Sequence, residues 1–310
     1  MFLQEKRLTD FFPVMAVLIL IFTLVYSFTF YYLLLNNLSI LKIIAGFIVY
    51  ITAFMTIYCQ FKAILTSPGI VESSERLTED QMSFSEKEKL NFFFKKYCKI
   101  CKHLRPERSH HCKTCKRCFL KMDHHCPWIG NCVGLNNQKY FYLFLFYSSI
   151  GCLSISICFA NEIYHYEFKP NPICKDGTHL LMFFRVFSFL QIFSSNEIFL
   201  IFLKLFCNLR DFLCATFTGV IAISMFCTIG YLFSYQTYLF MTNKTSIEHI
   251  KLKSGQKTPY CFESKMMNLR IVLGFDSIIY WFIPVNRPNP YNDGNNFPKP
   301  NLENFLKYEN

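Results

Sequence analysis

Charged side chains are scarce in this sequence of 310 residues, where Asp, Glu, Lys and Arg together make up 17%. A soluble domain usually contains about 25%, so the composition disfavours a soluble globule. Apolar residues reach 52%, which excludes a disordered chain. The 15 Cys are many, but the chain is too long and too apolar for a small secreted domain held by disulfides. The composition favours a membrane protein with a polar insert that carries cysteines.

Four stretches have almost no charge, and each is long enough for a membrane-spanning helix, which takes about 20 apolar residues. They are residues 11–35, 43–65, 140–160 and 212–240. Lys62 alone interrupts them, near the end of the second stretch, where its side chain can reach the interface. The first stretch is too long for a signal-peptide core and no small-residue cleavage site follows it, so we expect a retained anchor. Because the spans largely lack ionisable side chains, a transporter or channel is disfavoured.

A fifth apolar stretch, residues 180–207, is interrupted by polar side chains at positions 194–197. The pieces on either side are too short to span a bilayer. We expect a helix in the membrane interface that leads into the fourth span. A fifth span is the alternative, and it would put the two long polar regions on opposite faces of the membrane.

Basic residues indicate the orientation in the membrane. Lys and Arg dominate positions 95–121, where Glu107 is the only acid, and they recur just after the fourth span. The positive-inside rule therefore predicts that the insert and both termini are cytosolic. The predicted domains are spans one and two (1–66), a cytosolic linker and Cys-rich domain (67–139), spans three and four (140–240) and a cytosolic C-terminal region (241–310). Its end, residues 286–310, is rich in Asn and Pro and is expected to be disordered.

The insert contains an internal repeat of metal-ligand type. Cys98, Cys101, His111 and Cys118 follow the pattern Cys-x2-Cys-x9-His-x6-Cys, and Cys112, Cys115, His125 and Cys132 repeat it 14 positions later. In a reducing cytosol such cysteines are metal ligands or reactive thiols rather than disulfides. Closed structural zinc sites use four nitrogen and sulfur ligands in tetrahedral geometry. The sequence predicts two structural Zn2+ ions, whose binding would supply much of the folding free energy of this polar insert.

The repeat leaves one cysteine without a metal role. Cys126 aligns with Cys112, but the position where its partner ligand would stand is Ile129. His124 and Asp123, just before it, are also unused. A thiol, an imidazole and a carboxylate so close together suggest nucleophilic catalysis. His124 could act as the general base and Asp123 could orient its ring, while the surrounding basic side chains favour the thiolate.

The segment from Cys98 to Phe141, with DHHCPWIGNCVGLNNQKYF at 123–141, resembles the signature of DHHC-type protein S-acyltransferases, or palmitoyltransferases. The resemblance implies that Cys126, with His124 and Asp123, takes a long-chain acyl group from palmitoyl-CoA. It then passes this group to membrane-proximal cysteines of substrate proteins in a ping-pong reaction. The same resemblance implies that both zinc ions are structural. We expect an endomembrane location, in the Golgi or the endoplasmic reticulum.

Three other segments resemble the family less closely. Residues 67–69 read Ser-Pro-Gly where the family has Asp-Pro-Gly, and residues 245–248 read Thr-Ser-Ile-Glu where it has Thr-Thr-x-Glu. In the latter, Ser246 keeps the hydroxyl, and the resemblance places this segment near the catalytic group. Residues 268–284 resemble the family's C-terminal membrane-packing motif, with Asn268 as its buried Asn.

A membrane-anchored zinc-binding adaptor or ubiquitin-ligase-like module is the alternative function. It would also contain interleaved zinc sites, but it would not explain Cys126 preceded by Asp123 and His124. The basic stretch 243–257 lacks interleaved aromatic side chains, so no nucleic-acid partner is expected. No recruiting domain is recognisable, so substrate proteins are expected to be recruited by the tails, the lipid bilayer or an accessory subunit. We also expect small residues of the third span, Gly151 and Cys152, to leave room for the acyl chain.

Overall fold

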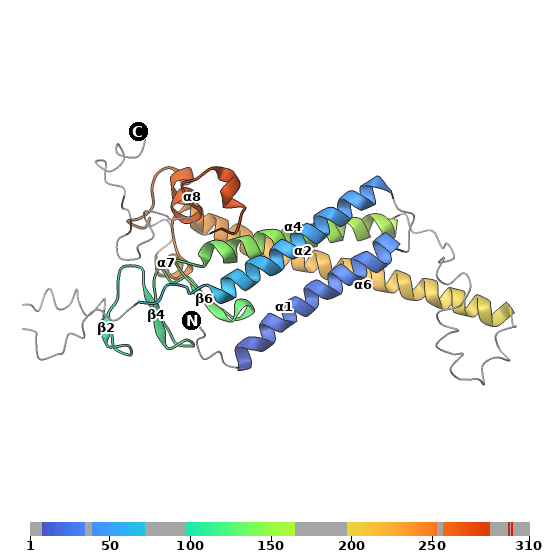
Figure 1. Cartoon of the computed structure of the whole chain (residues 1–310), viewed down its shortest axis with the longest axis horizontal. Coiled ribbons are helices and arrows are strands. Elements are labelled where there is room, and N and C mark those ends of the chain that lie inside the picture. The colour runs from blue at the N-terminus through green and yellow to red at the C-terminus, as the bar shows by residue number, and fades with distance from the viewer. Residues whose placement is uncertain are drawn as a thin grey trace, which may run out of the picture. The chain divides into compact units, whose positions relative to one another are not determined.

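The computed structural model describes residues 8–34, 39–71, 97–164, 197–252 and 257–285, together with 297 and 299. Among these residues, four helices are long and apolar enough to cross a membrane (Figure 1). They are Phe11–Leu34, Ile40–Leu65, Gln138–Tyr164 and Phe212–Met241. They coincide with the four predicted spans, and the Cys-rich segment lies between the second and the third. The protein is therefore an α-helical multi-pass membrane protein, as predicted.

The first span combines helix α1 (Leu8–Ser27) with the π-helical segment η1 (Phe28–Leu34). The others are α2 (Ile40–Leu65), α4 (Gln138–Tyr164) and α6 (Glu197–Met241). With 45 residues, α6 is about 67 Å long, roughly twice the thickness of a bilayer core. Residues 197–207, expected in an interfacial helix, are thus continuous with the fourth span. The rest of that stretch, residues 180–196, lies outside the described residues.

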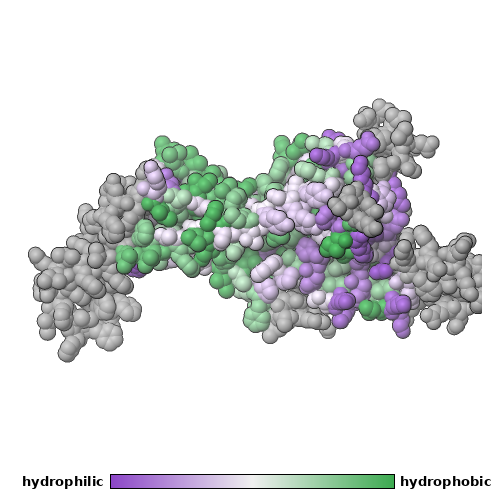
Figure 2. Space-filling model, turned by 180° about the vertical axis from the view of Figure 1, so that it is seen from behind, coloured by the Kyte–Doolittle hydropathy of each residue, from purple (hydrophilic) through white to green (hydrophobic). Residues whose placement is uncertain are grey.

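The chain forms two compact units. We call residues 1–17, 56–146 and 231–310 the site unit, and residues 18–55 and 147–230 the helical unit. The helical unit has a core that includes Phe28, Val49 and Phe159. Large apolar side chains such as Phe54 and Phe217 are exposed, as expected of helices that face lipid. Figure 2 shows hydrophobic side chains over the helices on the visible face and hydrophilic ones over the hairpins and the C-terminal segment.

Gly151 lies on α4 where this helix faces α2 in the helical unit. A Cβ at this position would lie 3.1 Å from the Oγ1 of Thr52 and 3.6 Å from its Cβ. Thr52 therefore lies beside the glycine, and room for the acyl chain at Gly151 and Cys152 stays a prediction. Small residues let membrane helices approach each other closely, which is the role that the structure gives to this glycine.

Residues 97–133 of the site unit form three antiparallel hairpins. They are β1 (Tyr97–Cys98) with β2 (His103–Leu104), β3 (His110–Cys112) with β4 (Arg117–Phe119), and β5 (His124–Cys126) with β6 (Asn131–Val133). Cys98, Cys112 and Cys126 hold equivalent places, opposite His103, Arg117 and Asn131. The tips turn through left-handed residues at the same spacing, Lys102, Lys116 and Gly130 (φ 56°, 56° and 53°). The repeat therefore has a third copy, in which Ile129 stands in the place of the second cysteine.

After α6 the chain turns at Asn243 and enters two short helices, α7 (Ser246–Lys251) and α8 (Lys265–Leu273), followed by a 3-10 turn, η7 (Ile278–Trp281). A capping box between Thr245 and Glu248 fixes the first turn of α7, which lies beside the hairpins (Figure 1). Asn268 is buried and donates to the carbonyls of Met241 and Phe262, each at 2.9 Å. Asn268 is thus buried, as expected.

Two residues of the C-terminal tail contact other parts of the site unit. Phe297 is only 7% exposed and packs with Tyr260 and Leu135. Lys299 forms an ion pair with Glu107, with Nζ 3.3 Å from Oε1. The expectation of disorder does not hold at these two positions, because an aromatic ring from the tail has an apolar site to fill. The remainder of 286–310 lies outside the described residues.

Candidate active site and metal centres

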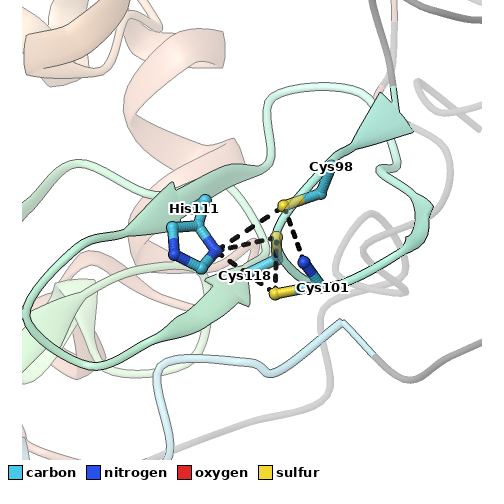
Figure 3. Close-up of side chains that lie close together, drawn as sticks. All are labelled: Cys98, Cys101, His111 and Cys118. Atoms are coloured by element: carbon cyan, nitrogen blue, oxygen red, sulfur yellow. Dashed lines mark hydrogen bonds between the residues drawn. The ribbon is translucent and has the colours of Figure 1, made fainter.

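The first predicted ligand set comes together between hairpins one and two. Cys98 and Cys101 belong to the first hairpin, whereas His111 and Cys118 face each other across the second. Their side chains converge on one point (Figure 3), with all four ligand atoms within 4.8 Å of one another. The Nδ1 of His111 lies 3.6 Å from the Sγ of Cys98, 3.2 Å from that of Cys101 and 3.8 Å from that of Cys118.

The second set comes together between hairpins two and three in the same way. Cys112 and Cys115 come from the second hairpin, and His125 and Cys132 face each other across the third. The Nδ1 of His125 lies 3.8, 3.4 and 3.6 Å from the Sγ atoms of Cys112, Cys115 and Cys132 respectively. Each hairpin therefore shares a ligand set with the next one.

The geometry of both sets fits a tetrahedral zinc ion. Zn–S bonds of about 2.3 Å and Zn–N bonds of about 2.0 Å place neighbouring ligand atoms about 3.5–3.8 Å apart. The observed Sγ–Nδ1 distances lie close to these values, and the Cys115–Cys132 Sγ–Sγ distance is 3.6 Å. The backbone N–H groups of Cys101 and Cys115 donate to the first sulfur of their own set, at 3.4 and 3.3 Å. Each set can hold one metal ion, and its three thiols and one imidazole match zinc.

Strand β5 separates two kinds of chemistry by the alternation of its side chains. Successive residues of a strand point to opposite faces, so the faces of His124 and Cys126 differ from that of His125. His125 joins the metal cluster, whereas His124 lies near enough to the Cys126 side chain for the two to interact electrostatically. Cys126 is buried. It is also the one cysteine of residues 97–133, all of which the structure describes, that belongs to neither ligand set.

Asp123 is fully buried, with 0% of its surface exposed, and it accepts four hydrogen bonds. Its Oδ2 accepts from the Nδ1 of His124 at 2.8 Å, from the Oγ of Ser246 at 2.9 Å and from the Nε2 of Gln236 at 3.1 Å. Its Oδ1 accepts from the backbone N–H of Ser246 at 2.6 Å. Burial alone would raise the pKa of this carboxyl, but the hydrogen bonds from His124, Ser246 and Gln236 hold its pKa below the usual value. The carboxylate is therefore the favoured form.

His124 connects this carboxylate to the thiol. Burial lowers the pKa of the imidazole, but the hydrogen bond to Asp123 and the interaction with Cys126 outweigh this and raise the pKa to about 9. The ring also packs edge-on against Phe141, with the ring centroids 5.2 Å apart. Because Nδ1 faces Asp123, the ring presents Nε2 for the thiol. The arrangement stabilises a protonated imidazole between two acceptors of its protons, as a general base requires.

Arg108 fixes the segment that supplies Ser246. Its Nε and Nη2 donate to Oε1 and Oε2 of Glu248, each at 2.8 Å, and its other contacts reach the side chain and carbonyl of Asn243. The guanidinium lies over the ring of Tyr260, 4.6 Å from the centroid. Glu248 in turn accepts from the backbone N–H of Thr245 at 2.9 Å. This buried two-pronged ion pair holds the start of α7 in place, and Ser246 reaches Asp123 from there.

The structure brings all eleven predicted site residues into this region, but two contacts were not predicted: that of Gln236 with Asp123 and that of Arg108 with Glu248. Gln236 had no expected role, and Arg108 was expected only as one of the basic residues of positions 95–121. An amide in a span without charges was a signal for Gln236, since polar side chains inside spans usually face the protein interior. Ser246 lies beside Asp123, as expected, and makes two hydrogen bonds to it. Ser67, in the place of the family's acid, accepts from the N–H of Gly69 at 3.3 Å.

Comparisons with known proteins agree with this geometry. A family model described as DHHC palmitoyltransferase matches residues 91–253. Human palmitoyltransferase ZDHHC3 is 30% identical over 249 residues, which cover 80% of this chain and 71% of the relative. Bovine palmitoyltransferase ZDHHC20 is 34% identical over 206 residues (66% and 46%). Rat palmitoyltransferase ZDHHC15 is 26% identical over 318 residues (94% and 83%).

The family match covers more than half of the chain and contains the three hairpins and Ser246. The matched segment also contains both ligand sets and Cys126, the cysteine outside them. The chain belongs to the DHHC palmitoyltransferase family, and it is a membrane-embedded protein S-acyltransferase.

Proposed function

We propose that Cys126 is the nucleophile of this palmitoyltransferase, that palmitoyl-CoA is its acyl donor and that cysteines of substrate proteins are the final acceptors. One observation carries the proposal: His124 is hydrogen-bonded to Asp123 and interacts with the side chain of Cys126, beside two ligand sets that use the other cysteines of the hairpins. A thiol paired with an imidazole whose orientation is fixed by a carboxylate is the arrangement of an activated nucleophile.

In the first half-reaction, His124 takes the proton of the Cys126 thiol, and the sulfur attacks the carbonyl carbon of the acyl-CoA thioester. A new C–S bond forms to Cys126. As the tetrahedral intermediate collapses, the C–S bond to CoA breaks, and the CoA thiolate takes the proton from His124. The products are acyl-Cys126 and free CoA. Asp123 holds the ring with Nδ1 protonated, so that Nε2 can move the proton in both directions.

In the second half-reaction, the thiol of a substrate cysteine gives its proton to His124 and attacks the acyl-Cys126 thioester. The acyl group moves to the substrate sulfur, and Cys126 leaves as a thiolate that recovers the proton from His124. One thioester is exchanged for another in each step, so no nucleotide hydrolysis is required. The two half-reactions together restore the starting enzyme, which is the ping-pong scheme expected from sequence.

The two ligand sets would each hold one Zn2+ with a structural role. A bound zinc would supply closed tetrahedral coordination that ties neighbouring hairpins together. Cys98, Cys101, His111 and Cys118 would hold one ion, and Cys112, Cys115, His125 and Cys132 the other. His125 and Cys132 flank Cys126 in the same hairpin. The metal sites would therefore fix the backbone on both sides of the thiol.

The orientation in the membrane follows from charge. We place the hairpins and both termini in the cytosol, because basic residues dominate positions 95–121. The acyl chain gains about 0.8 kcal/mol for each CH2 buried in the bilayer, whereas polyanionic CoA belongs in the cytosol. A thiol close to the end of a span can meet both parts of the donor. We propose a Golgi or endoplasmic reticulum location, and recruitment of substrates by the tails, the membrane or an accessory subunit.

Acyl transfer can be tested with purified protein and a labelled palmitoyl-CoA analogue. We expect wild type to take up label that hydroxylamine removes, and Cys126→Ser to take up none. Cys227→Ser is a matched control, because Cys227 is an exposed cysteine of α6 outside both ligand sets. It should label like wild type. Equal labelling of Cys126→Ser would place the acyl acceptor elsewhere, and a protein that binds zinc but never labels would support the adaptor alternative.

A further inference from the structure

The C-terminal end of α2 contacts the third hairpin through side-chain amides. The last carbonyl groups of a helix have no partner within the helix. At the end of α2, the Nδ2 of Asn131 points at these groups, 3.2 Å from the carbonyl oxygen of Ala63, 3.3 Å from that of Ile64 and 3.2 Å from that of Thr66. The Nδ2 of Asn137 adds a second bond to Ala63 at 3.2 Å.

Asn131 occupies a special place in this hairpin. It lies directly opposite Cys126 in the β5–β6 register and is 7% exposed. Its Oδ1 accepts from the backbone N–H of Cys132 at 2.9 Å, so both ends of its amide are used. The residue directly opposite the thiol-bearing position of β5 therefore binds the end of a membrane helix.

Gln60 of α2 contacts the tip of the third hairpin. Its side chain is fully buried on α2, and its Nε2 donates to the carbonyl of Trp128 at 3.2 Å. Its Oε1 has no hydrogen-bond partner within the part of the chain that the structure describes. An apolar side chain would avoid the cost of this buried acceptor. The bond to Trp128 is therefore the contribution that favours an amide at position 60.

The three hairpins differ in what holds their tips. In the first two, a Cys-x2-Cys pair joins the tip to a ligand set: Cys98 with Cys101, and Cys112 with Cys115. In the third, the positions equivalent to such a pair are Cys126 and Ile129, and neither belongs to a ligand set. The third hairpin has no metal-binding pair at its tip, and the hydrogen bonds from Gln60 and Asn131 attach it to α2 instead.

We propose that Asn131 and Gln60 are positioning residues for the acyl transfer reaction, which fix the tip of the third hairpin, and with it the thiol of Cys126, to the end of α2. The inference rests on the proposed function. Because α2 is a membrane span, these amides set the position of the thiol relative to the bilayer, where the acyl thioester arrives. A displacement of about 1 Å at a reacting atom can cost about 100-fold in rate, so a modest loosening of the tip is enough to be measured.

The test uses full-length protein with the variants Asn131→Ala, Gln60→Leu and their combination. Asn136→Ala is the matched control, since Asn136 is an exposed asparagine just after the same hairpin. Three quantities are measured: the rate of labelling of Cys126 by palmitoyl-CoA, the rate of its alkylation by iodoacetamide, and the zinc content. Iodoacetamide is small and water-soluble, so its reaction needs a free thiol but no alignment with the membrane.

We expect each single variant to be labelled about 10–100-fold more slowly, with alkylation of Cys126 at least as fast as in wild type and zinc content unchanged. The control should match wild type in all three. Because both amides hold the same tip, the loss in the double variant should be smaller than the product of the single losses.

Three results would overturn the inference: wild-type labelling rates in both single variants, loss of zinc together with labelling in both, or losses that multiply in the double variant. Gln60→Leu keeps the test decisive if Asn131→Ala fails to fold, since leucine fills a similar space and removes the unpaired Oε1 together with the bond to Trp128. A failure of the proposed function looks different, because wild type itself would then take up no label while iodoacetamide still reacted with Cys126.

Discussion

The two neighbouring histidines of β5 illustrate how a single residue step decides chemistry in this protein. His125 has its Nδ1 within 3.8 Å of three sulfurs, whereas the Nδ1 of His124 is bonded to a carboxylate. The sequence Asp-His-His-Cys therefore contains one metal ligand between two members of the proposed catalytic group. The alternation of side chains along a strand makes this possible, because it directs neighbours to opposite faces.

Alanine substitutions of the two histidines should have opposite signatures. His124→Ala should slow labelling about 100–10,000-fold, the usual contribution of a general base, with zinc content near wild type. His125→Ala should lose zinc and lower the unfolding temperature of the hairpins. Labelling kinetics, metal analysis and thermal unfolding of both variants provide the check. An exchange of the two signatures would show that the assignment of ligands along β5 is off by one residue.

Ser246 offers a second check at the residue scale. Ser246→Ala removes the Oγ donor to Asp123 but keeps the backbone N–H bond to the same carboxylate. A hydrogen bond to a charged group is worth about 1.5–3 kcal/mol, so labelling should slow about 10–100-fold. Ser246→Thr keeps the hydroxyl and should restore most of the rate. If the threonine variant were as slow as the alanine variant, the hydroxyl would not be the group that matters.

At the scale of elements, the site depends on how the start of α7 is attached to the hairpins. The first turn of α7 is held by its own capping box and by Arg108, which pairs with Glu248 through two hydrogen bonds of 2.8 Å. The side chain of Arg108 is 1% exposed. A buried pair of this kind stabilises mainly by avoiding an unpaired charge, so the loss of one partner is the costly change.

Arg108→Met should therefore destabilise the protein by about 3–5 kcal/mol, because it leaves the carboxylate of Glu248 without its counter-ion. The double variant Arg108→Met with Glu248→Gln should recover a part of this loss. Chemical unfolding of the four proteins in the cycle gives the coupling between the two residues. Additive losses would mean that Arg108 stabilises α7 through the ring of Tyr260 rather than through the ion pair.

Several elements could be predicted from the sequence because local patterns determine them. Long apolar runs predicted the spans, and a repeat of 14 residues predicted the two ligand sets. Gln236, which lies 113 residues from Asp123, could not be assigned, since an isolated polar residue in a span does not reveal its partner. The role of Gly151 could not be assigned for the same reason, because a glycine permits close contact and empty space alike; the structure places Thr52 beside it.

At the scale of the whole molecule, the apolar helices and the small hairpins depend on different forces. The spans need only apolar surface and internal backbone hydrogen bonds. The hairpins have strands of two or three residues, and a hairpin of this size is marginal in water on its own. Metal binding to the two ligand sets would therefore carry much of the stability of the hairpins but little of that of the spans.

Removal of zinc by a strong chelator should therefore disrupt the hairpins and leave the membrane spans largely intact. Labelling of Cys126 should be lost, and the hairpins should become sensitive to protease, while far-ultraviolet circular dichroism retains most of its helical signal. Addition of zinc should restore labelling at least in part. Full activity after complete metal removal, verified by metal analysis, would contradict a structural role for the two ions.

The contact between Asp123 and Ser246 spans 123 residues of chain, and this separation has a consequence for the order of biosynthesis. At translation rates of about 5–20 residues per second, Ser246 is added roughly 6–25 s after Asp123. During that interval the nascent polypeptide already contains the thiol of Cys126, but the carboxylate beside His124 lacks its donors from Ser246 and Gln236. The full set of hydrogen bonds to Asp123 can therefore form only after the last span has been synthesised.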